Sequence, residues 1–173
     1  MYENIKKQIR DVPDFPKKGI LFKDITPVLK NAECFTESIN AFYELFKDTK
    51  IDKIVSVDAR GYLFGAPLAY KLGCGLVLIR KAGKLPAETI KETYDLEYGT
   101  ATVEIHKDAV SAGEKVVIVD DLLATGGTTK AACNLLKKLN ADILSVAFLI
   151  ELTELNGRKV LEPYAPVISL LRY

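Results

Sequence analysis

The chain has 173 residues, with 24 Lys and Arg against 23 Asp and Glu and a formal net charge of +1, which argues against a protein that binds nucleic acid through its charge. Its length fits one domain spanning residues 1–173, and a hydrophobic content of 49% can supply a core that buries about 70% of the unfolded chain's surface. No apolar run approaches the roughly 18 residues that span a bilayer, and three widely spaced cysteines, Cys34, Cys74 and Cys133, favour neither a disulfide framework nor a zinc site.

Residues 1–33 are expected to form a small N-terminal hood. Residues 2–10 predict a short helix and show no signal-peptide pattern, so we expect a cytoplasmic protein without a membrane partner. Three prolines and a glycine within residues 12–27 exclude a long regular element. The same segment is nevertheless rich in large apolar side chains, namely Phe15, Ile20, Leu21, Phe22 and Ile25. It therefore either wraps the core as an arm or forms a wall of a ligand site.

Residues 34–79 alternate between helix and strand patterns. A stripe of four apolar residues predicts a helix over residues 34–48. Residues 53–57 and 76–79 predict strands, and a second helix between them ends near Gly73. This alternation predicts an α/β fold with a central, mostly parallel sheet and helices on both faces.

Charged loops follow both of these strands. The first carries Asp58, Ala59 and Arg60, and the second carries Arg80, Lys81 and Lys84. Ligands of such sheets bind beyond the carboxyl ends of the strands. Each basic side chain alone is typical of a solvated loop, but four at one edge indicate a site for a pyrophosphate.

Residues 81–107 are expected to form a lid loop and a β-hairpin. Residues 87–95 are polar and predict a mobile excursion, and residues 96–99 predict a turn. Apolar and polar residues then alternate from 101 to 106, which indicates a strand with one buried face. The hairpin could cover the ligand site or mediate a dimer contact, and the sequence leaves both open.

The most informative stretch runs from Val116 to Thr129. Four β-branched residues, 116–119, predict a strand buried on both faces, and Asp120 and Asp121 follow where that strand is expected to end. A loop of small residues and an amphipathic helix come next. Backbone N–H groups of such a loop and of the helix start can hold a phosphate, while the two acids suit ribose hydroxyls or a metal ion on a polyphosphate.

The alternative for this stretch is an ordinary strand-to-helix turn. The order of strand, acidic pair, glycine loop and helix favours the phosphate site. The chain lacks the Gly-Lys-Ser/Thr of an ATPase phosphate loop and the G-x-G-x-x-G of a dinucleotide site. Beyond it, residues 143–152 and 167–170 predict two more strands, with a short helix over residues 157–161.

The stretch Val-Asp-Asp-Leu-Leu-Ala-Thr-Gly-Gly-Thr, residues 119–128, resembles the phosphoribosyl pyrophosphate (PRPP) loop of type I phosphoribosyltransferases, and of the adenine enzymes in particular. Asp-Ala-Arg-Gly at 58–61 and Arg-Lys-x-Gly-Lys-Leu-Pro at 80–86 resemble further blocks of that family. So does the segment from Phe15 to Pro27, with Lys23 where arginine is usual. The resemblance extends from Phe15 to Tyr173.

This resemblance implies a type I phosphoribosyltransferase fold and a Mg²⁺-dependent reaction in which adenine and PRPP give AMP and pyrophosphate. It also implies a homodimer and no nucleic-acid partner. The implied site for the 5′-phosphate is formed by Ala124, Thr125, Gly126, Gly127 and Thr128. The implied site for pyrophosphate is formed by Asp58, Ala59, Arg60, Arg80, Lys81 and Lys84. Mg²⁺ would be held mainly by PRPP, with help from Asp120 and Asp121, which would also bind the ribose hydroxyls and favour the developing cation.

For the base, the resemblance implies that Phe22 and Leu152 sandwich the purine ring while backbone groups of Leu21 and Lys23 read its 6-amino edge. It assigns Glu97, beside Tyr98 on the lid, to acid–base catalysis, although Glu97 alone would be interpreted as a solvated turn residue. Three alternatives stay open. They are a PRPP-sensing regulator without catalysis, a nucleotide-binding structural module, and a phosphoribosyltransferase for another purine.

Overall fold

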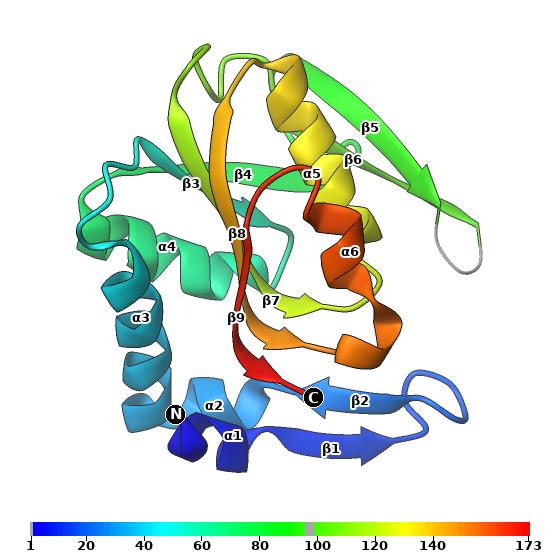
Figure 1. Ribbon diagram of the computed structural model, residues 1–173. Helices are drawn as coiled ribbons and strands as arrows, with labels where there is room; N and C mark the ends of the chain where they lie inside the picture. Colours follow the sequence, from blue (N-terminus) through cyan, green and yellow to red (C-terminus); the bar gives the residue numbers. More distant parts are fainter. Residues whose placement is uncertain (1, 96–98) are drawn as a thin grey trace.

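A mixed sheet forms the centre of the molecule (Figure 1). In the computed structural model, which describes residues 2–95 and 99–173, seven strands form this sheet in the order β5-β6-β4-β3-β7-β8-β9. The strands are β3 (Lys53–Val57), β4 (Gly75–Lys81), β5 (Thr89–Asp95), β6 (Thr100–His106), β7 (Lys115–Leu123), β8 (Asp142–Glu151) and β9 (Val167–Arg172). Strands β4, β3, β7, β8 and β9 are parallel to one another. Strand β6 is antiparallel to β4, and β5 is antiparallel to β6. The predicted, mostly parallel sheet is confirmed.

Helices cover both faces of this sheet, as the alternation of elements predicts. One face packs against α5 (Gly127–Lys138) and α6 (Gly157–Leu161), and the other against α3 (Ala32–Phe46) and α4 (Gly61–Leu72), with α1 (Glu3–Gln8) and α2 (Thr26–Lys30) beyond them. Residues 116–119 of β7 are fully buried and alternate between the two cores. Among the described residues no helix has the length and apolar character needed to cross a membrane.

The hood is more regular than the sequence predicts. It contains a two-stranded antiparallel sheet, β1 (Arg10–Pro13) and β2 (Leu21–Asp24), which lies beside the carboxyl end of β9 in Figure 1. The prolines do not prevent these strands because Pro13 ends β1 and Pro16 lies in the connecting loop, where no ladder hydrogen bond is needed. The rings of Phe15 and Phe22 pack edge to face at 5.1 Å between centroids.

The lid segment also differs from its prediction. Within residues 87–95, expected to be a mobile excursion, residues 89–95 form β5 and pair along their full length with β6. Polar strand residues are held by helix α5, because Glu92 accepts hydrogen bonds from Asn134 at 2.7 Å and from Lys138 at 2.6 Å. Residues 103–105 of β6 are buried on both sides, since Glu104 is as inaccessible as its two neighbours. Residues 96–98 of the predicted turn lie outside the described residues.

Strand β7 continues past its predicted end. Its pairing with β8 persists through Asp120 and Leu122 to Leu123, so both acids lie within the strand rather than after it. The cause is the length of β8, which runs to Glu151 and offers backbone partners along the whole acidic segment. Successive strand residues point to opposite faces, so the two acids have different surroundings.

Candidate active site

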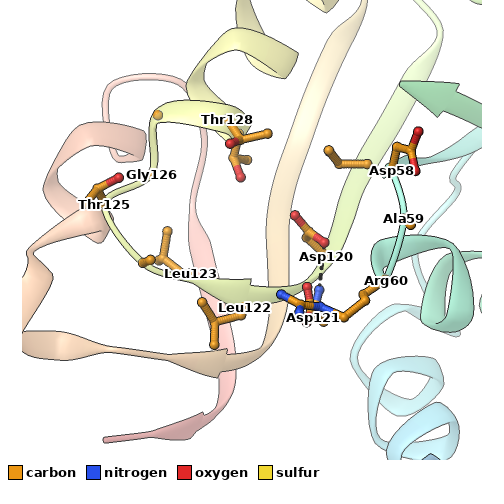
Figure 2. A pocket seen from close by; sticks show the side chains of 14 residues that line it. Asp58, Ala59, Arg60, Asp120, Asp121, Leu122, Leu123, Thr125, Gly126 and Thr128 are labelled. Carbon is orange, nitrogen blue, oxygen red and sulfur yellow. Dashed lines mark hydrogen bonds and ion pairs between the residues drawn. The ribbon is translucent and has the colours of Figure 1, made fainter. Parts of the chain in front are cut away.

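A cavity of about 400 Å³ opens at the carboxyl edge of the sheet, between the ends of β3 and β7. Two segments that are far apart in the sequence line it, residues 57–60 and residues 120–129 (Figure 2). The structure therefore brings the Asp-Ala-Arg loop together with the acidic strand end and the glycine loop. The Asp58–Ala59 peptide bond in the first segment is cis.

The glycine loop has the geometry of an anion site. Helix α5 begins at Gly127, and its N-cap residue Gly126 has a φ of 84°, a conformation that side chains disfavour. The first N–H groups of a helix lack backbone partners, and here they border the cavity. The Thr128 hydroxyl donates a hydrogen bond of 2.9 Å to the Tyr94 hydroxyl on β5, so the hairpin reaches this loop directly.

Gly157 supports the glycine loop from behind and was not recognised from the sequence. A Cβ atom at Gly157 would lie 2.1 Å from the Ala124 carbonyl oxygen, and one at Gly126 would lie 2.9 Å from the Gly157 carbonyl oxygen. The loop and the start of α6 thus pack backbone against backbone, which requires glycine on both sides. The sequence signal that was available is the pair Asn156-Gly157. In the structure Asn156 has a positive φ of 54°.

The two adjacent acids are not equivalent. Figure 2 shows Asp120 pointing into the cavity and Asp121 lying beside Arg60. Asp121 is buried, and its carboxylate is 2.5 Å from the Nε atom of Arg60. Burial, together with the charge of Asp121, raises the pKa of the Asp120 carboxyl well above its ordinary value. Helix α4 also approaches closely, since a Cβ atom at Gly61 would lie 2.8 Å from Asp120 Oδ1.

The basic residues predicted to bind pyrophosphate are divided between the cavity and its surroundings. Arg60 lines the cavity, whereas Arg80, Lys81 and Lys84 do not. Arg80 connects the two groups, because its Nε lies 3.3 Å from Asp58 Oδ2 and its Nη1 donates to the Lys84 carbonyl oxygen at 3.0 Å. The side chains of Lys81 and Lys84 are exposed.

The residues predicted to bind adenine also lie outside this cavity. Leu21, Phe22, Lys23 and Leu152 do not line it. The ring of Phe22 lies 5.6 Å from the guanidinium carbon of Arg60, which brings the hood to the cavity rim. The ammonium of Lys23 is 2.6 Å from Asp11 Oδ1 and 4.2 Å from the centre of the Tyr173 ring.

Tyr173 connects the two predicted walls of the base site. Its N–H donates to the Glu151 carbonyl oxygen at 2.9 Å, and its own carbonyl accepts the Thr153 N–H at 2.8 Å. Leu152 lies between these two residues, while the ring of Tyr173 packs under Lys23 of the hood. Glu97 and Tyr98 lie outside the described residues, so their predicted roles stay predictions.

The carboxylates at the cavity are largely occupied by basic side chains. Asp121 pairs with Arg60 and Asp58 with Arg80, which leaves Asp120 as the cavity acid without an ion pair among the described residues. Within residues 2–95 and 99–173, no three His, Cys, Asp or Glu side chains lie close enough together to hold a metal. The carboxylate of Asp120, which points into the cavity, is an oxygen ligand of the kind that Mg²⁺ accepts.

The fold and this cavity are those of a phosphoribosyltransferase, and similarity to known proteins indicates the same family. The profile of the phosphoribosyl transferase domain matches residues 25–172, and the chain belongs to that family. Its relatives include the adenine phosphoribosyltransferase of Thermoanaerobacter sp. (strain X514), which is 58% identical over 171 residues covering 99% of this chain and 98% of that protein.

Two solved structures extend this similarity to the fold. The adenine phosphoribosyltransferase of Thermoanaerobacter pseudethanolicus is 57% identical, with a TM-score of 0.96 and full coverage of both chains. The Saccharomyces cerevisiae enzyme, complexed with adenine and an imino-altritol bisphosphate, is 46% identical with a TM-score of 0.93 and covers 98% of this chain and 97% of its own.

Proposed function

We propose that this chain transfers the 5-phosphoribosyl group of PRPP to adenine, giving AMP and pyrophosphate as a step of purine salvage. The observation that carries the proposal is the cavity that joins the Asp58–Arg60 loop to Asp120 and the glycine loop, in a chain similar over its full length to adenine phosphoribosyltransferases. Formation of AMP from adenine and PRPP with Mg²⁺ tests it. Binding of PRPP without turnover would instead indicate a PRPP-sensing protein.

In this proposal the glycine loop, residues 124–128, holds the 5′-phosphate. The support is physical, because small residues, the free N–H groups at the start of α5 and the Thr128 hydroxyl all border the same cavity. Fixing the phosphate at one end of PRPP orients the ribose toward Asp120, which points into the cavity.

The pyrophosphate end is assigned to the loops after β3 and β4. Asp58, Ala59 and Arg60 border the cavity, and Arg80 extends this edge toward Lys81 and Lys84. The leaving group gains negative charge as its bond to C1′ breaks, so cations placed there favour the transition state over the bound substrate. Mg²⁺, when carried in on PRPP, neutralises part of the same charge.

The ribose gains positive charge in the same step. The carboxylate of Asp120 can stabilise this positive charge, because its side chain enters the cavity and forms no ion pair among the described residues. The carboxylate of Asp121 is instead paired with Arg60. We therefore assign Asp120 to the ribose hydroxyls and the developing cation. Asp121 acts beside it and fixes the guanidinium of Arg60.

The base site is assigned to Phe22 and Leu152 as stacking partners and to the backbone of Leu21 and Lys23 as readers of the 6-amino edge. The side chain of Lys23 is engaged by Asp11 and Tyr173. A lysine in place of the family's usual arginine is therefore compatible with recognition through the backbone.

Adenine is expected to be preferred over hypoxanthine by at least about 30-fold in kcat/KM. Hypoxanthine presents the opposite donor and acceptor pattern at this edge, and each of two unpaired buried groups costs about 1–3 kcal/mol. Competition of the two bases for one PRPP pool measures the ratio, with guanine as a second comparison. Equal kcat/KM for adenine and hypoxanthine would contradict the assignment and favour a different purine as substrate.

We also propose that the active protein is a homodimer, as the resemblance implies. Four exposed large apolar side chains belong to the consecutive elements α4 and β4, namely Leu63, Tyr70, Leu76 and Leu78, and Tyr70 is 90% exposed. A second copy of the chain would remove this apolar area from water. Light scattering should give twice the chain mass of 19.1 kDa, and a single-chain mass at assay concentration would contradict the proposal.

A further inference from the structure

We infer that Glu104 on β6 is a positioning residue that fixes the loop after β4 so that Lys84 is presented to the pyrophosphate group. The inference rests on the proposed function and adds a residue that the reaction itself does not assign. Glu104 was expected on the polar side of its strand, but it is only 1% exposed. Burial of a carboxylate without partners costs folding free energy, so partners for Glu104 are expected.

The partners of Glu104 are backbone groups of the pyrophosphate loop. Its Oε1 atom accepts the N–H of Lys84 at 2.9 Å and the N–H of Leu85 at 3.0 Å. Its Oε2 atom accepts the Thr89 hydroxyl at 3.2 Å and lies 3.7 Å from the Lys91 ammonium. One carboxylate thus binds two successive N–H groups of the loop and joins them to β5.

Glu104 is ionised in this setting. Burial alone would raise the pKa of its carboxyl, but the two loop N–H groups and the Thr89 hydroxyl outweigh it and hold the pKa below its ordinary value. An ionised carboxylate only accepts hydrogen bonds, and each neighbour described above is a donor. The carboxylate therefore keeps its loop partners at neutral pH.

A second set of contacts restrains the same loop from its other side. The Lys84 carbonyl oxygen accepts from Arg80 Nη1 at 3.0 Å, and the Ala82 N–H donates to the Thr102 carbonyl oxygen at 3.0 Å. Both peptide groups of Lys84 are therefore bound, which fixes the direction of its side chain. That side chain is exposed, and its ammonium forms no ion pair within residues 2–95 and 99–173. A fixed backbone carrying a free cation suits an incoming anion.

Glu104→Ala is the direct test. We expect KM for PRPP and the inhibition constant for pyrophosphate each to rise about tenfold and kcat to fall, all toward the values of Lys84→Ala, with KM for adenine within about twofold of wild type. Glu104→Gln should stay within about threefold, because its amide oxygen can still accept both loop N–H groups. Glu88→Ala is the matched control, since Glu88 is an exposed carboxylate on the same segment that pairs with Lys107.

A double variant separates positioning from general stability. If Glu104 acts through Lys84, then Glu104→Ala added to Lys84→Ala should change KM for PRPP by less than about twofold. Full additivity, an equal rise in KM for adenine, or wild-type KM for PRPP in folded Glu104→Ala would overturn the inference. If Glu104→Ala does not fold, Glu104→Asp is measured instead, because it keeps the charge and withdraws the carboxylate from the loop.

Amide hydrogen exchange tests the restraint without any assay of activity. The Lys84 and Leu85 amides should exchange at least about tenfold more slowly in wild type than in Glu104→Ala or Glu104→Asp. Equal exchange would overturn the inference even if the enzyme makes AMP. Slow exchange in a protein that makes no AMP would instead mean that the loop restraint is present and the proposed reaction is wrong.

Discussion

Replacement of Glu97 by glutamine is expected to slow AMP formation in a single turnover by about 10²–10⁴-fold, the usual contribution of general acid–base catalysis. Adenine must lose the N9 proton as N9 attacks C1′, while N7 gains electron density, and a carboxyl group closing over the purine can manage one of these protons. Affinity for PRPP should be largely kept, because its phosphate contacts are assigned to other loops.

The prediction rests on the family resemblance, since Glu97 lies outside the described residues, and on where the preceding strand leads. Tyr94 reaches the glycine loop through Thr128, and the Asp95 carbonyl oxygen would lie 3.6 Å from a Cβ atom on Gly127. Rapid-quench measurement is required, because product release can conceal the chemical step in kcat. A single-turnover rate equal to wild type would show that Glu97 is not an acid–base group and that the hairpin acts only as a cover.

Asp120→Asn is expected to lower kcat by about 10²-fold or more and, at the same time, to raise the melting temperature by a few °C. The catalytic loss follows from removing the charge that faces the ribosyl cation. The gain in stability follows from the raised pKa of Asp120. A carboxyl whose folded pKa is raised opposes folding when ionised. This penalty is absent below the ordinary carboxyl pKa of about 4 and grows as pH rises through that value toward the folded pKa.

Asp121→Asn is the matched comparison. It should also lower kcat by about 10²-fold, but it removes the partner of Arg60 and should lower the melting temperature rather than raise it. Thermal unfolding at pH 4 and pH 7 measures both effects, and the gain from Asp120→Asn should shrink at pH 4. If kcat stays near wild type in both variants and only KM rises, the two acids merely bind the ribose of the substrate.

The sequence predicted best where local pattern and tertiary surroundings agree. Residues 53–57 and 157–161 form their predicted strand and helix with the predicted bounds, because runs of apolar residues and helix-forming residues carry that information locally. Strand β5 was missed because its polar side chains are stabilised from outside the segment. The partners of Glu92, Asn134 and Lys138, lie more than forty positions away along the chain.

The same distinction applies to the site. The meeting of Asp58–Arg60 with residues 120–128 could be predicted, since parallel strands bring their carboxyl ends to one edge. The inequivalence of Asp120 and Asp121 could not, because it depends on how far β8 extends and on where Arg60 lies. Glu104 appeared to be a surface residue for a similar reason, as its partners are backbone N–H groups that only the folded loop brings near.

The backbone contact between Gly157 and the glycine loop limits the transfer of that loop to another protein scaffold. The loop packs against a segment some thirty residues downstream, the start of α6. There Gly157 leaves room for the Ala124 carbonyl oxygen, which would lie 2.1 Å from a Cβ atom at that position. Residues 119–129 transplanted alone onto another strand–turn–helix scaffold would therefore arrive without the surface that shapes them. A designer who wants this anion cradle must carry over two pieces of chain, the loop and the start of α6, and must keep glycine at both faces of their contact.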